Sequence, residues 1–432
     1  MTTIVDIYQL FLTHPVICSD TRQLKKGCIF FALKGGNYNG NQFAATAIEN
    51  GAAYVIVDEK EFAVNERCLL VDDVLTALQN LANHHRNQLK IPILAITGSN
   101  GKTTTKELCA AVLSRKYKTH YTKGNLNNHI GVPLTLLSIT REHEIAVIEM
   151  GANHQKEIEA LCEIAEPGYG MITNIGKAHL EGFGGIEGVK KGKGEMYQFI
   201  KSTNGLIFIN NDNNVLLELL STYSKKVTYG SISVSDVSGQ PVLKEGYLKV
   251  NCVKPFSIEI KTNLTGLYNF ENVLSAIAIG DYFKVKPEEI KSAIEFYFPA
   301  NQRSQIINKS NKVAIILDAY NANPSSMSAA LDNFNTAFNG YKIVALGDML
   351  ELGIESEKEH HAIGDRLKKL NFDKVILVGT EFKEIAKKFG FLHFANTADA
   401  SKWFAKNNFQ NCTLLIKGSR GIKMELIVDV FQ

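Results

Sequence analysis

The sequence predicts an α/β protein of three domains, and two observations support this prediction. Short apolar runs of strand type alternate with helical segments along the chain. This alternation restarts after Lys90-Ile91-Pro92 and again from Asn311, and 432 residues are enough for about two to four domains. We expect a small N-terminal α/β domain (1–90), a central domain with a mostly parallel sheet (91–310) and a C-terminal, doubly wound, Rossmann-like domain (311–432).

The N-terminal domain is expected to contain two buried strands, 29–33 and 53–57, with a helix over 43–49 between them. Asn50-Gly51 then closes that helix. The loop 35–41 is rich in glycine and asparagine. Such a loop can approach a ligand closely or can be a simple surface turn, and its composition leaves both interpretations open.

The central domain is expected to be of the P-loop ATPase type, because an apolar strand over 93–97 leads into the sequence G-S-N-G-K-T. A helix is predicted over 105–113, so backbone N–H groups and the positive helix terminus would face a bound phosphate. Lys102 would reach the outer phosphates of a nucleotide, and the Thr103 hydroxyl would hold Mg²⁺. An ordinary strand–helix turn is the alternative, but strand, loop, Lys-Thr and helix occur in the order of a P-loop. The candidate ATP-binding residues here are Gly98, Ser99, Asn100, Gly101, Lys102, Thr103 and Thr104.

Three further features of the central domain carry charge. Glu149 ends the apolar strand 145–148, and a carboxylate there suits Mg²⁺, although it could also begin a helix. His179 follows a strand over 170–174 and could be a metal ligand, an acid–base group or neither. The lysine-rich segment 190–195 is typical of a solvated basic turn.

The rest of the chain predicts two kinds of structure. Residues 226–262 alternate in short β-type runs, which indicates an antiparallel patch. Asn269 and Asn272 lie one turn apart at the start of a predicted helix, where amides could read a base edge or cap the helix. In the C-terminal domain, strands over 313–317, 342–346, 375–378 and 413–416 end in polar groups, as in ligand-binding doubly wound sheets.

Composition excludes several classes of protein. The net charge is +3, from 47 basic and 44 acidic residues, which gives no reason to expect a nucleic acid or an anionic membrane as a partner. No apolar run approaches the length of a transmembrane helix, and the N-terminus has no signal-peptide pattern. Seven cysteines are scattered singly, as in a reducing compartment, so we expect a cytoplasmic protein.

Six motifs occur in one order along the chain: G-S-N-G-K-T, E-M-G-A-N, I-T-N-I-G-K-A-H-L-E-G-F-G, D-A-Y-N-A-N-P, A-L-G-D-M-L-E-L-G and K-G-S-R. Together they resemble the Mur ligase family of peptidoglycan synthesis, over essentially the whole chain. The D-A-Y-N-A-N-P and G-D-M-L-E-L-G stretches are the specific ones. The S-D-T-R and G-C-I-F-F-A-L-K-G stretches are similar to that family's UDP-binding N-terminal domain.

The resemblance implies an ATP-dependent ligase that adds D-alanyl-D-alanine to UDP-N-acetylmuramoyl-tripeptide through an acyl phosphate. The D-N-P-R signature of the relative that adds the third amino acid is absent from the sequence. Another amino-acid ligase of the Mur and folylpolyglutamate synthase superfamily is the nearest alternative, and a non-catalytic P-loop nucleotide-binding protein is a more distant one. The substrates would be small molecules, with no nucleic acid, and we expect a monomer. The sequence leaves open whether the tripeptide ends in lysine or in diaminopimelate.

The resemblance also implies roles for individual residues. Lys102, Glu149, His179 and Lys193 would be catalytic, with two Mg²⁺ sites formed by Thr103, Glu149, His179 and a carbamate on Lys193. Lys190 and Lys191 are close enough in sequence to be alternatives to Lys193. ATP would also contact Asn269, Asn272, Arg303 and Asp318. The UDP substrate is assigned to Ser19, Thr21 and Arg22, and the dipeptide to Asn321, Asn323 and Asp348.

Overall fold

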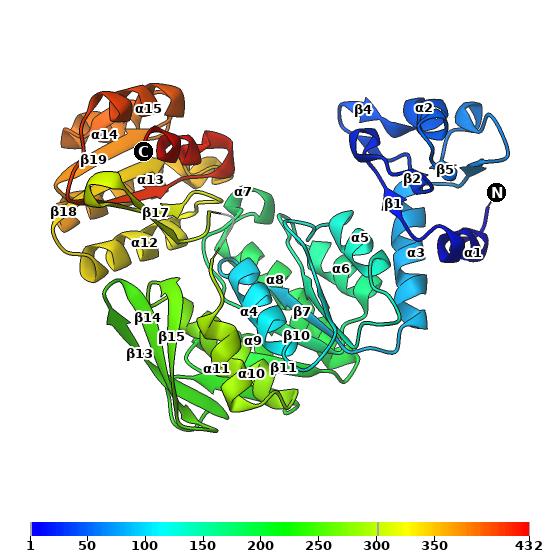
Figure 1. The fold of residues 1–432 in the computed structure, drawn as a ribbon, viewed down its shortest axis with the longest axis horizontal. Helices are drawn as coiled ribbons and strands as arrows, with labels where there is room; N and C mark the ends of the chain where they lie inside the picture. Colours follow the sequence, from blue (N-terminus) through cyan, green and yellow to red (C-terminus); the bar gives the residue numbers. More distant parts are fainter. Residues whose placement is uncertain (1, 300–301, 432) are drawn as a thin grey trace.

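A computed structural model describes residues 2–299 and 302–431 of the chain (Figure 1). In these residues the strands form three main sheets, which are built in turn from residues 17–70, 93–265 and 305–417. The N-terminal and C-terminal parts lie at opposite ends of the larger central part, at the upper right and upper left of Figure 1. The predicted α/β class with three domains and mostly parallel sheets is confirmed.

The N-terminal sheet is parallel, with strand order β1-β2-β5-β6. The long helix α3 leaves this sheet and packs against α5 and α6 of the central part, so it links the two (Figure 1). The elements are β1 (Ile17–Cys18), β2 (Ile29–Phe31), β5 (Tyr54–Val57), β6 (Cys68–Leu70), the short hairpin β3 (Lys34–Gly35) and β4 (Tyr38–Asn39), α1 (Ile4–Thr13), α2 (Ala44–Glu49) and α3 (Val74–Gln88).

The glycine- and asparagine-rich loop forms the β3–β4 hairpin and the turn after it. Its amides are used to hold the loop itself: Asn39 donates to Glu59, and the buried Asn41 donates to Asp58 at 2.8 Å. Lys34 completes this cluster with ion pairs to both carboxylates at 2.8 and 2.9 Å. These contacts give Asn39 and Asn41 a structural role.

The central sheet has the strand order β15-β14-β13-β12-β11-β10-β7-β9-β8. It is parallel from β8 to β13, and every residue of β7, β9 and β11 is buried, as expected for strands covered on both faces. The predicted antiparallel patch is present in β13 to β15, whereas β12 pairs in parallel with β11. The strands are β7 (Ile93–Thr97), β8 (Thr119–Tyr121), β9 (Ile145–Glu149), β10 (Tyr169–Ile172), β11 (Leu206–Asn210), β12 (Lys226–Gly230), β13 (Val237–Lys244), β14 (Tyr247–Lys254) and β15 (Ile258–Thr265).

Helices cover both faces of the central sheet (Figure 1). They are α4 (Lys102–Leu113), α5 (Gly131–Leu137), α6 (Glu157–Ala165), α7 (Leu180–Phe183), α8 (Ile186–Ser202), α9 (Asn214–Leu220), α10 (Asn269–Tyr282) and α11 (Pro287–Glu295).

The prediction of a solvated basic turn at 190–195 is wrong, because this segment lies inside α8. Glycines usually indicate turns, but here they allow close packing. A Cβ atom on Gly192 would lie 2.5 Å from the Phe183 ring, and one on Gly194 would lie 3.1 Å from Leu219. The segment is therefore part of a helix in which residues 192–195 are buried, and not a surface loop.

The C-terminal sheet has the order β16-β17-β21-β18-β19-β20, and only the edge strand β16 is antiparallel to its neighbour within the described residues. Because β16 belongs to it, this sheet begins before position 311. Its elements are β16 (Gln305–Lys309), β17 (Val313–Asp318), β18 (Tyr341–Gly347), β19 (Lys374–Val378), β20 (Leu392–Phe394), β21 (Cys412–Lys417), α12 (Pro324–Ala337), α13 (Ser356–Leu370), α14 (Lys383–Phe389) and α15 (Thr397–Lys406).

A search of the described residues finds no helix that is both long enough and apolar enough to cross a membrane.

We predict that Gly192→Ala destabilises the protein by about 1–3 kcal/mol, because the added methyl group meets the Phe183 ring. Thermal unfolding by calorimetry measures the effect as a lower Tm. Gly36→Ala is the matched control, since a Cβ atom there has nothing within 4 Å. Equal Tm values for the two variants would contradict the close packing of α8 on α7.

Candidate active site

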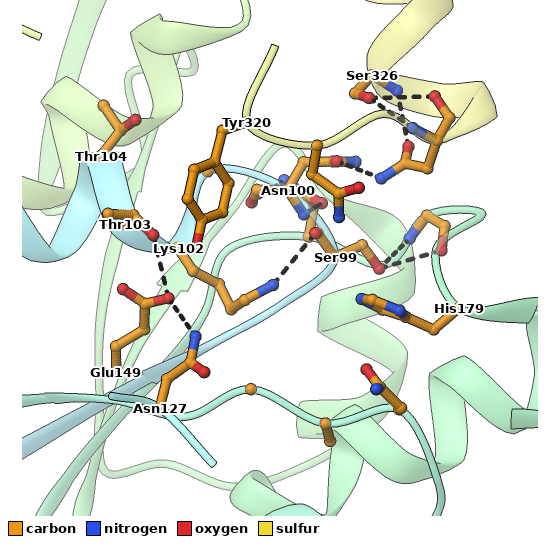
Figure 2. A pocket seen from close by; sticks show the side chains of 18 of the residues that line it. Ser99, Asn100, Lys102, Thr103, Thr104, Asn127, Glu149, His179, Tyr320 and Ser326 are labelled. Atoms are coloured by element: carbon orange, nitrogen blue, oxygen red, sulfur yellow. Dashed lines mark hydrogen bonds between the residues drawn. The ribbon is translucent and has the colours of Figure 1, made fainter. Parts of the chain in front are cut away.

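A cavity of about 910 Å³ lies where β7, β9 and β10 end, between the central and C-terminal parts. It brings together most of the predicted site residues (Figure 2). The predicted residues that line it are Ser99, Asn100, Gly101, Lys102, Thr103, Thr104, Glu149, His179, Asn269, Asn272, Arg303, Asp318, Asn321 and Asn323. Gly98, Lys193, Asp348, Ser19, Thr21 and Arg22 do not line it.

The loop between β7 and α4 has the backbone that a phosphate loop needs. Gly98 and Gly101 have φ angles of +141° and +80°, which glycine adopts at little cost, and Gly101 is the residue before the first turn of α4. A Cβ atom at Gly98 would lie 2.0 Å from the Thr173 hydroxyl oxygen. The loop is thus held tightly against the end of β10, with its N–H groups at a helix N-terminus.

Lys102 is folded back over this loop. Its Nζ donates to the carbonyl oxygens of Gly98 at 2.6 Å and Ser99 at 3.3 Å (Figure 2). Burial lowers the pKa of Lys102 to about 8, Glu149 opposes this shift, and the charge of Arg303 adds to it. The ammonium group therefore loses its proton at mildly basic pH unless an anion binds beside it.

One carboxylate oxygen of Glu149, at the end of β9, accepts hydrogen bonds, and the other accepts none among the described residues. Oε1 accepts hydrogen bonds from the Thr103 hydroxyl at 3.1 Å and from the Asn127 amide at 2.8 Å (Figure 2). Oε2 is buried and has no hydrogen-bond partner among the described residues, and Lys106 Nζ lies 4.0 Å from it. A buried carboxylate oxygen without a donor, next to a threonine hydroxyl, fits a hard divalent cation.

Lys193 projects from α8 into the protein and is only 1% exposed. Its Nζ donates to the Ala152 carbonyl oxygen at 2.9 Å and lies 5.0 Å from the centre of the Phe183 ring. Burial holds the pKa of Lys193 well below its ordinary value and Lys102 acts in the same direction, while Glu157 and Glu195 oppose them. A neutral amine is the form that reacts with CO₂, so Lys193 fits a carbamate site.

The alternatives to Lys193 have different surroundings. Lys190 forms an ion pair with Glu218 at 2.7 Å, which raises its pKa and keeps the amine protonated. Lys191 is exposed. The structure thus separates three lysines that the sequence leaves nearly equivalent.

His179 lines the cavity from the other side, just before α7. Its Nδ1 is hydrogen-bonded to the Glu351 carboxylate of the C-terminal part, and this contact lowers the pKa of Glu351. His179 has a φ angle of +52°, an unusual backbone conformation for a residue other than glycine.

The two asparagines of α10 do not cap the helix, since no side-chain cap bond is present at its start. Instead, the Asn272 amide donates to Asn269 Oδ1 at 2.8 Å, and Asn269 donates to the Thr265 carbonyl at 2.7 Å. Thr105 of α4 donates to Asn272 Oδ1 at 3.0 Å. The pair thereby ties α10 to the helix of the phosphate loop.

Arg303 and Asp318 face the cavity from the start of the C-terminal part. The Arg303 guanidinium lies 3.9 Å from the centre of the Tyr320 ring, and its buried Nε has no hydrogen-bond partner among the described residues. Asp318 accepts from Lys417 Nζ at 2.6 Å and from the Ser304 N–H at 3.2 Å. Arg303 is thus a cationic donor with unused hydrogen-bonding capacity.

The three residues assigned to the dipeptide have different environments. The Asn323 side chain caps α12 by accepting from the Ser326 N–H at 2.9 Å, and its amide donates to Asn100 at 2.8 Å. Asn321 is exposed, and its Oδ1 accepts from the Ala322 N–H. The buried Asp348 accepts from two backbone N–H groups at the start of α14 and lies outside the cavity lining, and burial raises its pKa.

The residues assigned to UDP lie in the N-terminal part, away from the cavity. Thr21 and Arg22 belong to a short 3₁₀ turn that begins at Asp20, and Ser19 precedes it. Arg22 forms a two-pronged ion pair with Asp20 on the surface. Their substrate contacts stay predictions.

Sequence reasoning missed several residues of the cavity. Asn127 donates a hydrogen bond to Glu149, and the Asn174 side chain accepts one from the Asn100 N–H. The Tyr320 ring lies against the Arg303 guanidinium. The amide-rich stretch 121–133 and the asparagine after β10 were the available signals. Glu351 could not be found, because only the approach of the C-terminal part brings it to His179.

The described residues contain no group of three or more His, Cys, Asp or Glu side chains that could hold a metal by themselves. A cation beside Glu149 and Thr103 would need further ligands from a nucleotide or from a modified side chain, as is usual for Mg²⁺ at phosphate sites.

Comparison with known proteins agrees with this geometry. Residues 16–86 match the family model "Mur ligase family, catalytic domain", 96–280 match "Mur ligase middle domain", and 302–420 match "Mur ligase, glutamate ligase domain". UDP-N-acetylmuramoyl-tripeptide–D-alanyl-D-alanine ligases of Bacillus subtilis and Escherichia coli are each 36% identical, over 98% of this chain and 93% and 94% of theirs.

Solved structures are similar over the whole length as well. A crystal structure of MurF from Acinetobacter baumannii has a TM-score of 0.87 at 33% identity and covers 96% of this chain and 92% of its own. MurF ligase from Thermotoga maritima, in complex with ADP, has a TM-score of 0.85 at 25% identity, covering 100% of this chain and 98% of its own.

Three matching domains, a phosphate loop and near-complete coverage by these relatives define an ATP-dependent ligase that forms amide bonds. The chain belongs to the Mur ligase family.

We predict that Lys193→Met raises the Tm at pH 7 by about 2–4 °C, since burying an amine with a depressed pKa costs folding free energy. Methionine fills the same space without a charge. Calorimetry of the variant and the parent, both at low CO₂, measures the difference. A lower Tm would show that the Lys193 amine contributes more through its bond to Ala152 than its burial costs.

Proposed function

We propose that this chain adds D-alanyl-D-alanine to UDP-N-acetylmuramoyl-tripeptide, with ATP converted to ADP and phosphate, in the synthesis of peptidoglycan precursors. The observation that carries the proposal is one cavity that joins a phosphate loop, an unpartnered carboxylate oxygen and cationic groups of the C-terminal part. The names of the relatives at 36% identity supply the acceptor and the dipeptide.

The proposed reaction has two steps. The terminal carboxylate of the tripeptide attacks the γ-phosphorus of ATP, which gives an acyl phosphate and ADP. The amine of D-alanyl-D-alanine then attacks the acyl carbon, loses a proton, and phosphate leaves. A free carboxylate is a poor electrophile, so phosphorylation provides the leaving group that amide formation needs.

The residues of the chain are assigned as follows. The backbone N–H groups of 98–104 and Lys102 bind the phosphates, and charge that develops during phosphoryl transfer is stabilised by the Lys102 ammonium. Asn269, Asn272, Arg303 and Asp318 contact the nucleotide. The C-terminal part closes the cavity, which keeps water from the acyl phosphate.

Mg²⁺ is the metal that fits. Thr103 and the free Glu149 oxygen would hold one ion, and His179 with a carbamate on Lys193 would hold the second. When bound, Mg²⁺ neutralises phosphate charge and polarises the phosphoryl group. The carbamate converts a buried amine into an anion, which explains a lysine at a place where a cation needs an acid.

Other assignments stay predictions. They include the contacts of Ser19, Thr21 and Arg22 with UDP, those of Asn321, Asn323 and Asp348 with the dipeptide, the domain division at 1–90, 91–310 and 311–432, the monomeric state and the cytoplasmic location.

The test is ADP release from ATP with UDP-muramoyl-tripeptide, with and without D-alanyl-D-alanine. We expect turnover only with both substrates, and mass spectrometry should find the pentapeptide product. Tripeptides that end in lysine and in diaminopimelate are compared in parallel. Turnover with UDP-muramoyl-dipeptide and a diamino acid instead would identify a different ligase of the family.

We predict a pH dependence of ADP binding from Lys102. Its pKa of about 8 means that the ammonium form dominates below pH 8 and is lost above it, so ADP affinity should fall about tenfold between pH 7 and pH 9. Calorimetric titration measures this affinity. Lys102→Arg keeps its charge throughout this range, so its pH profile should be flat whatever its affinity. A flat profile for the parent protein would contradict the phosphate-binding role of Lys102.

A further inference from the structure

The segment 176–181, between β10 and α7, carries His179 and lies against the C-terminal part. Its backbone makes two contacts there: the Lys177 N–H donates to Ser325 Oγ at 3.0 Å, and the Glu181 N–H to the Glu351 carbonyl at 3.3 Å. This short segment therefore links the cavity to the C-terminal part.

An ion pair and a histidine–carboxylate hydrogen bond connect the same surfaces. Lys177 Nζ lies 2.5 Å from Glu359 Oε1, and His179 Nδ1 is bonded to Glu351 Oε2. Their surroundings differ: the Glu359 side chain is 5% exposed, whereas that of Glu351 is 55% exposed. With a carboxylate this exposed, the second contact contributes little to stability, so Glu351 is poorly suited to holding the domains together.

The chemistry of the His179–Glu351 bond fixes the imidazole tautomer. An ionised carboxylate can only accept a hydrogen bond, so Nδ1 carries the proton. Nε2 has no hydrogen-bond partner among the described residues, and its ring lines the cavity (Figure 2). A neutral ring nitrogen with a lone pair is the form that binds a metal ion.

The backbone on both sides of this bond is unusual. His179 and Glu351 have φ angles of +52° and +63°, a conformation that costs energy for residues other than glycine. Gly353, with a φ angle of +54°, allows the turn after Glu351 to approach Glu181, since a Cβ atom there would lie 3.1 Å from the Glu181 side chain. Three positions thus accept a left-handed or crowded backbone around the His179–Glu351 hydrogen bond.

Glu351 and Gly353 belong to the stretch G-D-M-L-E-L-G that stands out in the sequence. Its other carboxylate, Asp348, is occupied by backbone N–H groups of the C-terminal part. Glu351 is the carboxylate of this stretch that reaches the central part.

We propose that Glu351 is a positioning residue for His179: it holds the ring so that Nε2 faces the cavity as a metal ligand. The inference rests on the metal-binding role proposed for His179. Because Glu351 belongs to the C-terminal part, His179 is oriented only when that part lies against 176–181. Closure of the C-terminal part would thus complete the second metal site.

Binding of Mn²⁺ tests this without turnover. Free Mn²⁺ is measured by electron paramagnetic resonance during titration of the full chain, with CO₂ and an ATP analogue that has methylene between the β- and γ-phosphorus atoms. We expect Glu351→Ala to weaken the second Mn²⁺ by about 10- to 100-fold and to leave the first unchanged. In the ligase assay, the Mg²⁺ concentration for half-maximal rate should rise correspondingly.

Glu359→Ala is the matched control, since it removes the carboxylate of the Lys177 ion pair and should leave the second Mn²⁺ affinity unchanged. His179→Ala distinguishes the positioning role of Glu351 from the metal-binding role of His179. If His179→Ala weakens the second Mn²⁺ and Glu351→Ala does not, the positioning role is wrong and the metal role of His179 stands. If His179→Ala has no effect on Mn²⁺, the metal role itself is wrong. Equal losses in Glu351→Ala and Glu359→Ala would assign the effect to domain contact alone and overturn the proposal.

Discussion

The site depends on the parallel pairing of β7 with β9 on one side and with β10 on the other. The register places Ile96 opposite Glu149 and Thr97 opposite Ile172, so the phosphate loop, the carboxylate and the end of β10 meet at one edge of the sheet. A slip by one residue would turn Glu149 to the other face, away from Thr103. The Thr97 hydroxyl, which donates to the Met150 carbonyl at 2.7 Å, helps to hold this register.

The C-terminal part contributes contacts as well as a wall to the cavity. Asn323 begins α12 and at the same time donates to Asn100 in the phosphate loop, so the start of that helix is directed at the nucleotide site. Lys177 and His179 make further contacts across the same boundary. A ligand bound in the phosphate loop would therefore affect contacts of both the central and the C-terminal part. These contacts can couple closure of the C-terminal part to the reaction.

The sequence predicts the strand ends well and the helix interior poorly. Apolar runs followed by a polar residue correctly predict Glu149 and Asp318 at the carboxyl ends of strands. Parallel strands that are buried on both faces leave a clear apolar pattern in the sequence. The sequence pattern predicts Lys193 in a turn, because segments of lysine and glycine are typical of surface turns. Its burial in α8 follows from the fit of Gly192 against Phe183, a contact across two helices that no local pattern contains. Glu351 was missed for the same reason, since its partner lies 172 residues away in the sequence.

The distribution of charge around the cavity indicates the kind of ligand it takes. Lys102 and Arg303 line the cavity, and the buried Arg303 Nε has no hydrogen-bond partner among the described residues. Lys106 Nζ lies 4.0 Å from Glu149 Oε2, and the charge of Lys102 acts on the buried Lys193. Burial lowers the pKa of Lys102 and of Lys193, so keeping these amines charged opposes folding. A polyphosphate bound beside them would stabilise the charged forms. The folding free energy that burial of these amines costs is reduced when an anion binds beside them. The site therefore favours the anionic ligands that the reaction requires.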